Sequence, residues 1–347
     1  MKQLFPKALF YKEWKNARWG LALFAFFLFY SKLFYAIQGL SFLKEVAQSG
    51  NLVVANNEYW FQQLMYVNDD VFVLLVIITA VLVYFLFYQD RQEATASLMS
   101  SMPFTKEQAF NVKWITGAGV IVAAFLVNGL LLTGFYFANR SWMFATPYQV
   151  IPTWIVLFLA FTLALFSFLL FVQCAMGHSL AAAVVGPIAS VVPWFFLAGL
   201  NDLVRHQFSL PYDHAAIDFL GRTADAVGWP YLLRTVYVQS PSGIHYPVYE
   251  NIPTKVFIFL AIAAVTFLLG RIVYKRNAVE KSGELLMFPF LEPVLIYGFA
   301  VCLGILLALL FGLGYGESSV LIIDAFLFGG FVGGCFLAKR VVAYYRH

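Results

Sequence analysis

Charged residues are scarce in this sequence. Of its 347 residues, 12% are charged, whereas 62% are hydrophobic and 19% are aromatic, and the mean hydropathy is +0.79. A composition so poor in charge excludes an ordinary soluble domain of this size. Apolar stretches of about 20 residues recur along the chain, and each is long enough to cross a hydrocarbon core roughly 30 Å thick. The sequence therefore predicts an all-α polytopic membrane protein.

Motifs of catalysis and of nucleotide binding are also missing. Cys174, Cys302 and Cys335 lie within or beside apolar runs without CxxC spacing, so we interpret them as packing residues. HExxH and GxSxG motifs are absent, and the segment GLGYGESS lacks the lysine of a phosphate-binding loop. We predict that the chain is not an enzyme, has no catalytic residue and receives its energy from another chain.

Eight apolar runs are predicted to span the membrane. They cover residues 19–40, 71–88, 115–137, 151–171, 180–200, 256–274, 294–313 and 319–342. With a cytoplasmic N-terminus, the inner segments hold 15 Lys and Arg residues, the outer segments hold 6, and Lys32 lies within a span. Because positively charged loops stay inside, both termini are predicted to be cytoplasmic.

The polar stretch of residues 90–114, DRQEATASLMSSMPFTKEQAFNVKW, separates spans two and three and would then face the cytoplasm. Its first half is rich in helix formers, Pro103 ends that helix, and Thr105 with Gln108 forms a capping box that starts another. We predict two short helices at a hinge. Glu93, Leu98 and Met99 offer a mixed polar and apolar surface for a cleft on a partner, and the alternative is a solvated interhelical loop.

Aromatic and basic residues alternate at the start of the chain, in LFPKALFYKEWKNARWG. This mixture is typical of a helix in the headgroup layer, whose ammonium groups reach anionic lipid. The segment is predicted to be an interfacial elbow or a simple anchor, with membrane lipid as its partner.

The outer segment, about 201–255, is predicted to form one or two short helices that dip into the outer leaflet. It also contains potential metal ligands. These are His206, Asp213, His214 and His245. Their spacing matches no known metal site, so no metal is predicted.

Two ionisable residues fall at membrane depth, Lys32 in the first span and Asp324 in the eighth. A lone charge there costs about 2.5–3.5 kcal/mol on insertion scales, so such groups pair, reach the interface or line a wet cavity. We hypothesise that Lys32 and Asp324 pair, or that each meets a counter-charge in a partner subunit. The alternative is that Lys32 only reaches outward to the interface.

The eighth span also carries two small-xxx-small pairs, which allow helices to approach closely. They are Gly329 with Gly333 and Gly330 with Gly334. The pattern predicts tight packing and leaves open whether the neighbour is internal or a second protomer.

The order of these features resembles that of the permease subunits of type-2 ABC transporters. An amphipathic N-terminal helix, a cytoplasmic segment after span two, a short inner turn (QCAMGHS) and a long outer segment follow one another. DRQEATASLMSSMPFTKEQAFNVKWITG is similar to the family's coupling segment, in which an acidic residue precedes a leucine, a Ser-Met-Pro turn and a polar helix. YKRNAVEKSGELLMFPFLEP is similar to a segment of Gram-positive Ytr-type permeases.

The resemblance implies a six-span permease core over residues 1–274. Residues 275–347 would add a cytoplasmic linker and an extra C-terminal two-helix hairpin. By position, the helix that docks on the ATPase would run from Arg91 to Ser101, with Glu93 and Met99 as contacts.

The resemblance also implies partners and a location. ABC-type ATPase subunits would bind ATP and magnesium, this chain would bind no cofactor and no nucleic acid, and a second permease would complete a homo- or heterodimer in a bacterial cell membrane. The predicted function is ATP-driven export of an unidentified, amphipathic substrate. The alternative is a ligand-sensing or scaffold protein of a cell-envelope stress or antimicrobial-peptide response.

Overall fold

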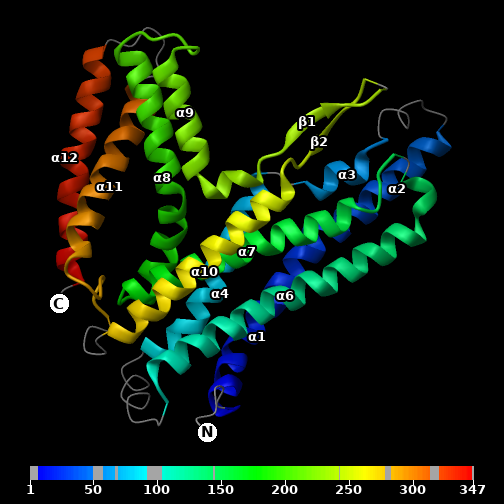
Figure 1. Cartoon of the computed structure of the whole chain (residues 1–347), viewed down its shortest axis with the longest axis horizontal. Coiled ribbons are helices and arrows are strands. Elements are labelled where there is room, and N and C mark those ends of the chain that lie inside the picture. Colours follow the sequence, from blue (N-terminus) through cyan, green and yellow to red (C-terminus); the bar gives the residue numbers. More distant parts are fainter. Residues whose placement is uncertain are drawn as a thin grey trace. The chain divides into compact units, whose positions relative to one another are not determined.

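A computed structural model describes residues 7–49, 58–66, 69–91, 104–143, 145–241, 243–277, 283–312 and 320–345 of the protein. Over these ranges the chain is mostly helical, and eight helices are long and apolar enough to cross a membrane (Figure 1). Each corresponds to one of the eight predicted spans. The prediction of an all-α polytopic membrane protein agrees with this architecture.

The membrane-length helices differ in their continuity. The first consists of α1 (Lys7–Leu28), η1 (Phe29–Phe34) and α2 (Tyr35–Gln48), and the others are α4 (Asp69–Tyr88), α6 (Lys106–Ala138), α7 (Val150–Ala175), α8 (Ser179–Gln207), α10 (Ile252–Arg276), α11 (Leu291–Leu307) with η7 (Ala308–Gly312), and α12 (Val320–Tyr344). The shorter elements are α3 (Trp60–Met65), η3 (Gln89–Arg91), η4 (Arg140–Trp142), α9 (Ala215–Val227), η5 (Trp229–Leu233), β1 (Val236–Gln239) and β2 (His245–Val248).

The chain folds into two compact units. Unit 1 comprises Met1–Asp90, Ser101–Phe171 and Leu233–Lys275, and unit 2 comprises Arg91–Ser100, Val172–Leu232 and Arg276–His347. Arg91, at which the predicted coupling helix would begin, belongs to unit 2, whereas Asp90 belongs to unit 1. The division into a six-span core and a C-terminal hairpin rests on the family resemblance and stays a prediction.

The first span is one continuous helical stretch of 42 residues. At 1.5 Å per residue it is about 63 Å long, which is twice the thickness of a hydrocarbon core. Its middle, Phe29–Phe34, is a π-helix, a form that inserts an extra residue into the helical turn and often occurs at functional positions. The basic N-terminal segment from Lys7 onward continues directly into the span, without a break that would make a separate elbow.

Unit 1 packs large aromatic side chains around α6. Phe110, Phe125 and Phe166 are fully buried, and α1 lies against both α6 and α4. At Gly117 of α6, an added Cβ would lie 2.2 Å from the ring of Phe166. Only glycine allows α6 to approach α7 this closely, so unit 1 is tightly packed around α6.

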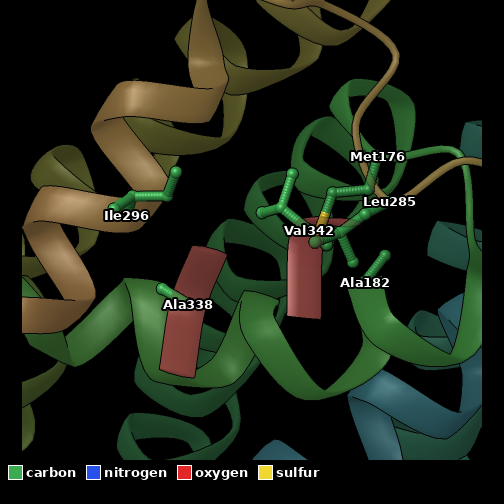
Figure 2. Packing of buried hydrophobic residues seen from close by; sticks show 6 residues of the cluster. All are labelled: Met176, Ala182, Leu285, Ile296, Ala338 and Val342. Carbon is green, nitrogen blue, oxygen red and sulfur yellow. The ribbon is translucent and has the colours of Figure 1, made fainter. Parts of the chain in front are cut away.

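Unit 2 is built on a close pair of helices, α11 and α12. An added Cβ at Gly330 would lie 2.7 Å from the Cα atom of Gly304, and one at Gly334 would lie 2.7 Å from the Cα atom of Ala300. A second cluster joins α12 to the turn between α7 and α8. Figure 2 shows its side chains, in which Met176, Leu285, Val342 and Ala182 lie together, beside Ile296 and Ala338.

Residues 201–255, which are predicted to lie outside the membrane, contain a helix, as predicted, and also a β-hairpin that was not predicted. The helix is α9, and the hairpin pairs Val236 with Val248 and Gln239 with His245. Strands of four residues carry too little alternation of polar and apolar residues to stand out in so apolar a sequence. The predicted entry of this segment into the outer leaflet stays a prediction.

Candidate functional site

Four charged side chains gather where the second span ends and the predicted coupling segment begins. Lys12 and Glu13 come from α1, Asp90 from η3 and Lys113 from α6. The Nζ atom of Lys113 lies 2.9 Å from both carboxylate oxygens of Glu13 and 2.5 Å from Oδ2 of Asp90. Lys12 pairs with Asp90, and its Nζ atom lies 3.6 Å from Oε1 of Glu13. We call these four residues the charge cluster.

The charge cluster is buried and electrically balanced. The side chains of Lys113 and Glu13 are fully buried, that of Asp90 is 8% exposed and that of Lys12 is 25% exposed. Two cations face two carboxylates, so no charge is left without a counter-charge. Balance matters because an uncompensated buried charge costs several kcal/mol.

The charge cluster connects three spans. In addition to its two carboxylate partners, Lys113 donates a hydrogen bond to the backbone oxygen of Leu86, near the end of α4. Its ammonium group therefore holds the end of the second span, the start of the third and the first turns of α1 in one place. A displacement of the chain at Asp90 would therefore be felt by all three helices.

The other end of the coupling segment is anchored as well. The predicted capping box is confirmed, because the Gln108 amide nitrogen donates to Oγ1 of Thr105 at 3.2 Å and the Thr105 amide nitrogen donates to Oε1 of Gln108 at 3.0 Å. Glu107, in the first turn of α6, pairs with Arg271 and Lys275 of α10, each at 2.9 Å. The described structure ends at Arg91 and resumes at Phe104, and side-chain contacts hold the helices on both sides of this gap.

Arg91 is the one predicted coupling residue that the structure describes. Its Nη2 atom donates hydrogen bonds to the backbone oxygens of Gln173 and Met176, and the latter bond measures 2.7 Å. Gln173 lies in the last turn of α7 and Met176 in the turn that connects α7 to α8, both within unit 2. Glu93, Leu98, Met99 and Ser101 lie outside the described residues, so their coupling role stays a prediction.

The inner turn that Arg91 contacts is itself tied to the linker that precedes α11. The amide nitrogen of Gly177 donates to the oxygen of Leu285 at 3.2 Å, and that of Met287 donates to the oxygen of Ala175 at 3.1 Å. Asn277 adds a side-chain bond to the oxygen of Cys174. Arg91 therefore holds a structured turn.

Lys32 and Asp324 have partners other than each other. The Nζ atom of Lys32 donates to the backbone oxygens of Leu64 at 2.7 Å and Tyr66 at 3.0 Å, at the end of α3. The carboxylate of Asp324 accepts a bond from Nε2 of Gln207 at 3.5 Å. Lys32 belongs to unit 1 and Asp324 to unit 2, so their pairing gains no support and stays a prediction.

The two glycine pairs of α12 play different parts. Gly330 and Gly334 lie against α11, so the tight packing expected for this pair is internal. Gly329 and Gly333 have no described atom within 4 Å of an added Cβ.

The potential metal ligands are dispersed. The Nδ1 atom of His206 lies 2.8 Å from the backbone oxygen of Asp202, and His214 caps α9 by accepting from the amide nitrogen of Ala216. Within the part of the chain that the structure describes, no three His, Cys, Asp or Glu residues are grouped as a metal ion would require.

Sequence reasoning missed the charge cluster, because it counted Lys12 and Lys113 only as positive residues of inner segments. A signal was present. Glu13 is the first carboxylate of the chain and stands alone before Glu45, within a strongly basic segment. A single acid among basic residues at the end of a span is a candidate partner for a buried cation.

These features define the protein as a helical, multi-pass membrane protein. It carries a balanced, buried ion cluster at the point where a polar segment enters and leaves its spans. Comparisons of the chain with protein-family models, curated proteins and solved structures found no match. Function must therefore be argued from the residues themselves.

Proposed function

We propose that this chain is the transmembrane permease subunit of a type-2 ABC transporter. In this proposal, separate ATPase subunits hydrolyse ATP and push on residues 91–101, and the chain converts that push into export of an amphipathic substrate. The family is inferred from the resemblance of residues 90–114 to the coupling segment of these permeases. The same resemblance supports three further parts of the proposal: an outward-facing segment, a second permease subunit and a location in a bacterial cell membrane.

The charge cluster is the observation that most supports the proposal. A segment that receives mechanical work needs stiff attachments, since a flexible joint would absorb the displacement. Asp90 and Glu107 stand next to the two ends of the coupling segment, and each is held by two cations from helices of unit 1. An ordinary solvated loop needs no buried, balanced ion cluster at its root.

In the proposed mechanism, ATP hydrolysis shifts the equilibrium between two packing arrangements of the helices. ATP-driven closure of the ATPase subunits would displace residues 91–101, and the charge cluster would pass that displacement to α1, α4 and α6 together. Because close-packed helices exchange between discrete arrangements, the spans would switch between two states that expose the substrate path to opposite sides.

The test is purification of the full-length chain in mild detergent from its own membrane, followed by measurement of MgATP hydrolysis. We expect an ABC-type ATPase to accompany the chain and its turnover to depend on the coupling segment. The triple variant Glu93→Ala, Leu98→Ala and Met99→Ala should abolish substrate-stimulated hydrolysis. A matched control is Asp218→Ala, Phe219→Ala and Val227→Ala, which removes one acid and two apolar side chains exposed on α9.

Stimulated hydrolysis should be normal in the control. Purification of the chain without any ATPase, or normal stimulated turnover in the triple variant of the coupling segment, would contradict the proposal. Purification with a kinase in place of an ATPase would favour the ligand-sensing alternative.

A further inference from the structure

The first turns of α1 have two different faces. One face is buried and includes Leu9, Glu13, Ala17 and Gly20. The other face is exposed. Its residues recur every three or four positions, so their side chains lie along one stripe of the helix. The exposed stripe consists of Lys7, Tyr11, Trp14, Lys15, Arg18 and Trp19, which we call the basic stripe.

The length of the first span places the basic stripe at a membrane surface. From Trp19 to Lys44 the helix rises about 38 Å, which covers the hydrocarbon core with little to spare. Between these two residues the only charge is Lys32, and it is buried. Trp14 and Trp19 therefore fall where tryptophan prefers to lie, at the level of the headgroups, and the cations of the stripe lie beside or beyond them.

The part of the protein that the structure describes does not neutralise the three cations of the basic stripe. Within the ranges that the structure describes, Lys7, Lys15 and Arg18 have no carboxylate within ion-pair distance. The one carboxylate of these turns, Glu13, points to the opposite face and is held by Lys113. Arg18 lies over the ring of Trp19, with 5.7 Å between its guanidinium carbon and the ring centroid. The stripe is thus a site of positive charge beside amphipathic rings.

We propose that the basic stripe binds the phosphate headgroups of anionic phospholipid. The cations would meet the phosphates, and the rings of Trp14 and Trp19 would lie at the base of the headgroup layer. An acidic protein segment would also neutralise the cations, but the position of Trp14 and Trp19 at the level of the headgroups favours lipid. Binding of lipid at this site does not depend on the proposed transport function, whereas the effect of lipid on the coupling segment, described next, rests on that function.

Lys12 connects the proposed lipid site with the charge cluster. It stands between Tyr11 and Glu13 in the same helical turn, yet its ammonium group is turned inward to Asp90. Lipid bound to the basic stripe would fix the first turns of α1, and these turns carry half of the charge cluster. Anionic lipid would thereby stiffen the attachment of the coupling segment.

Brominated lipids provide a direct test, because bromine on an acyl chain quenches nearby tryptophan fluorescence. The full-length protein would be placed in nanodiscs of phosphatidylcholine that contain a minor fraction of brominated phosphatidylglycerol or, in parallel, of brominated phosphatidylcholine. The signal of Trp14 and Trp19 is the difference between the parent protein and the variant Trp14→Phe, Trp19→Phe. We expect the anionic lipid to be enriched about tenfold at these residues.

The variant Lys7→Gln, Lys15→Gln, Arg18→Gln should lose this preference. It should keep its helix content by circular dichroism, because the three side chains are exposed. The matched control is Lys44→Gln, Arg140→Gln, Arg234→Gln, which removes three exposed cations elsewhere in unit 1 and should keep the preference. Added salt should weaken the preference in the parent protein.

Equal quenching of Trp14 and Trp19 by the two lipids in the parent protein would overturn the proposal. So would a preference that survives in the Lys7, Lys15 and Arg18 variant.

Discussion

Two lysines of unit 1 are both buried, and they are stabilised in different ways. Lys113 meets the carboxylates of Glu13 and Asp90, whereas Lys32 meets the backbone oxygens of Leu64 and Tyr66 and lies 5.8 Å from the ring centroid of Trp154. Within the described residues, carboxylates are the partners of the first lysine and backbone dipoles are the partners of the second. The two sites therefore hold a buried ammonium group in two different ways.

The two arrangements have different consequences for the helices around them. Lys113 connects three membrane-length helices, so its loss would be felt across unit 1. Lys32 connects the π-helical part of the first span to one short helix, α3, whose end presents free carbonyl groups and a partial negative charge. Its loss would be felt locally. Four variants test how buried charges, dipoles and exposed ion pairs differ in their effect.

Replacing Lys113 with methionine should have the largest effect. The substitution leaves Glu13 and Asp90 buried without their shared counter-charge, and loss of one partner of a buried ion pair costs about 3–5 kcal/mol. We expect a large drop in the midpoint of thermal unfolding of the purified protein in detergent. A midpoint within a few degrees of the parent protein would contradict the importance of the cluster.

A second variant distinguishes loss of charge balance from loss of packing. Glu13→Gln combined with Lys113→Met removes one charge of each sign, and Lys12 still balances Asp90. The double variant should therefore be more stable than Lys113→Met alone. With Glu13→Gln measured as well, the double-mutant cycle should give an interaction energy on the order of 1–3 kcal/mol between the two residues.

The sequence predicts those features that depend on neighbouring residues alone. The eight spans follow from the length of apolar runs, and the capping box follows from Thr105 and Gln108, three residues apart. The charge cluster does not, because Glu13 and Lys113 are 100 residues apart and their meeting depends on which spans pack together. The partners of Lys32 leave no mark in the sequence at all, since every residue has a backbone oxygen.

Replacing Lys32 with methionine should have an intermediate effect. The variant loses two charge-assisted hydrogen bonds, which are worth about 1.5–3 kcal/mol each, but it also removes a buried charge and so recovers part of that energy. We expect a net loss of about 1–3 kcal/mol in the same unfolding experiment. The control is Lys44→Met, an exposed lysine of the same helix, which should leave the midpoint unchanged. If Lys32→Met proved as damaging as Lys113→Met, the contrast between charges and dipoles would fail.

Replacing Glu107 with glutamine should have the smallest effect on stability. Its partners Arg271 and Lys275 are 40% and 67% exposed, and ion pairs that are this accessible to water contribute roughly 0.2–1 kcal/mol. Salt should reduce the difference between this variant and the parent protein, whereas it should leave the deficit of Lys113→Met nearly intact, because buried charges are poorly screened. Unfolding midpoints measured at low and high salt for both variants provide the comparison. Equal salt dependence would mean that water reaches Lys113 and that the charge cluster is as open to solvent as the ion pairs of Glu107.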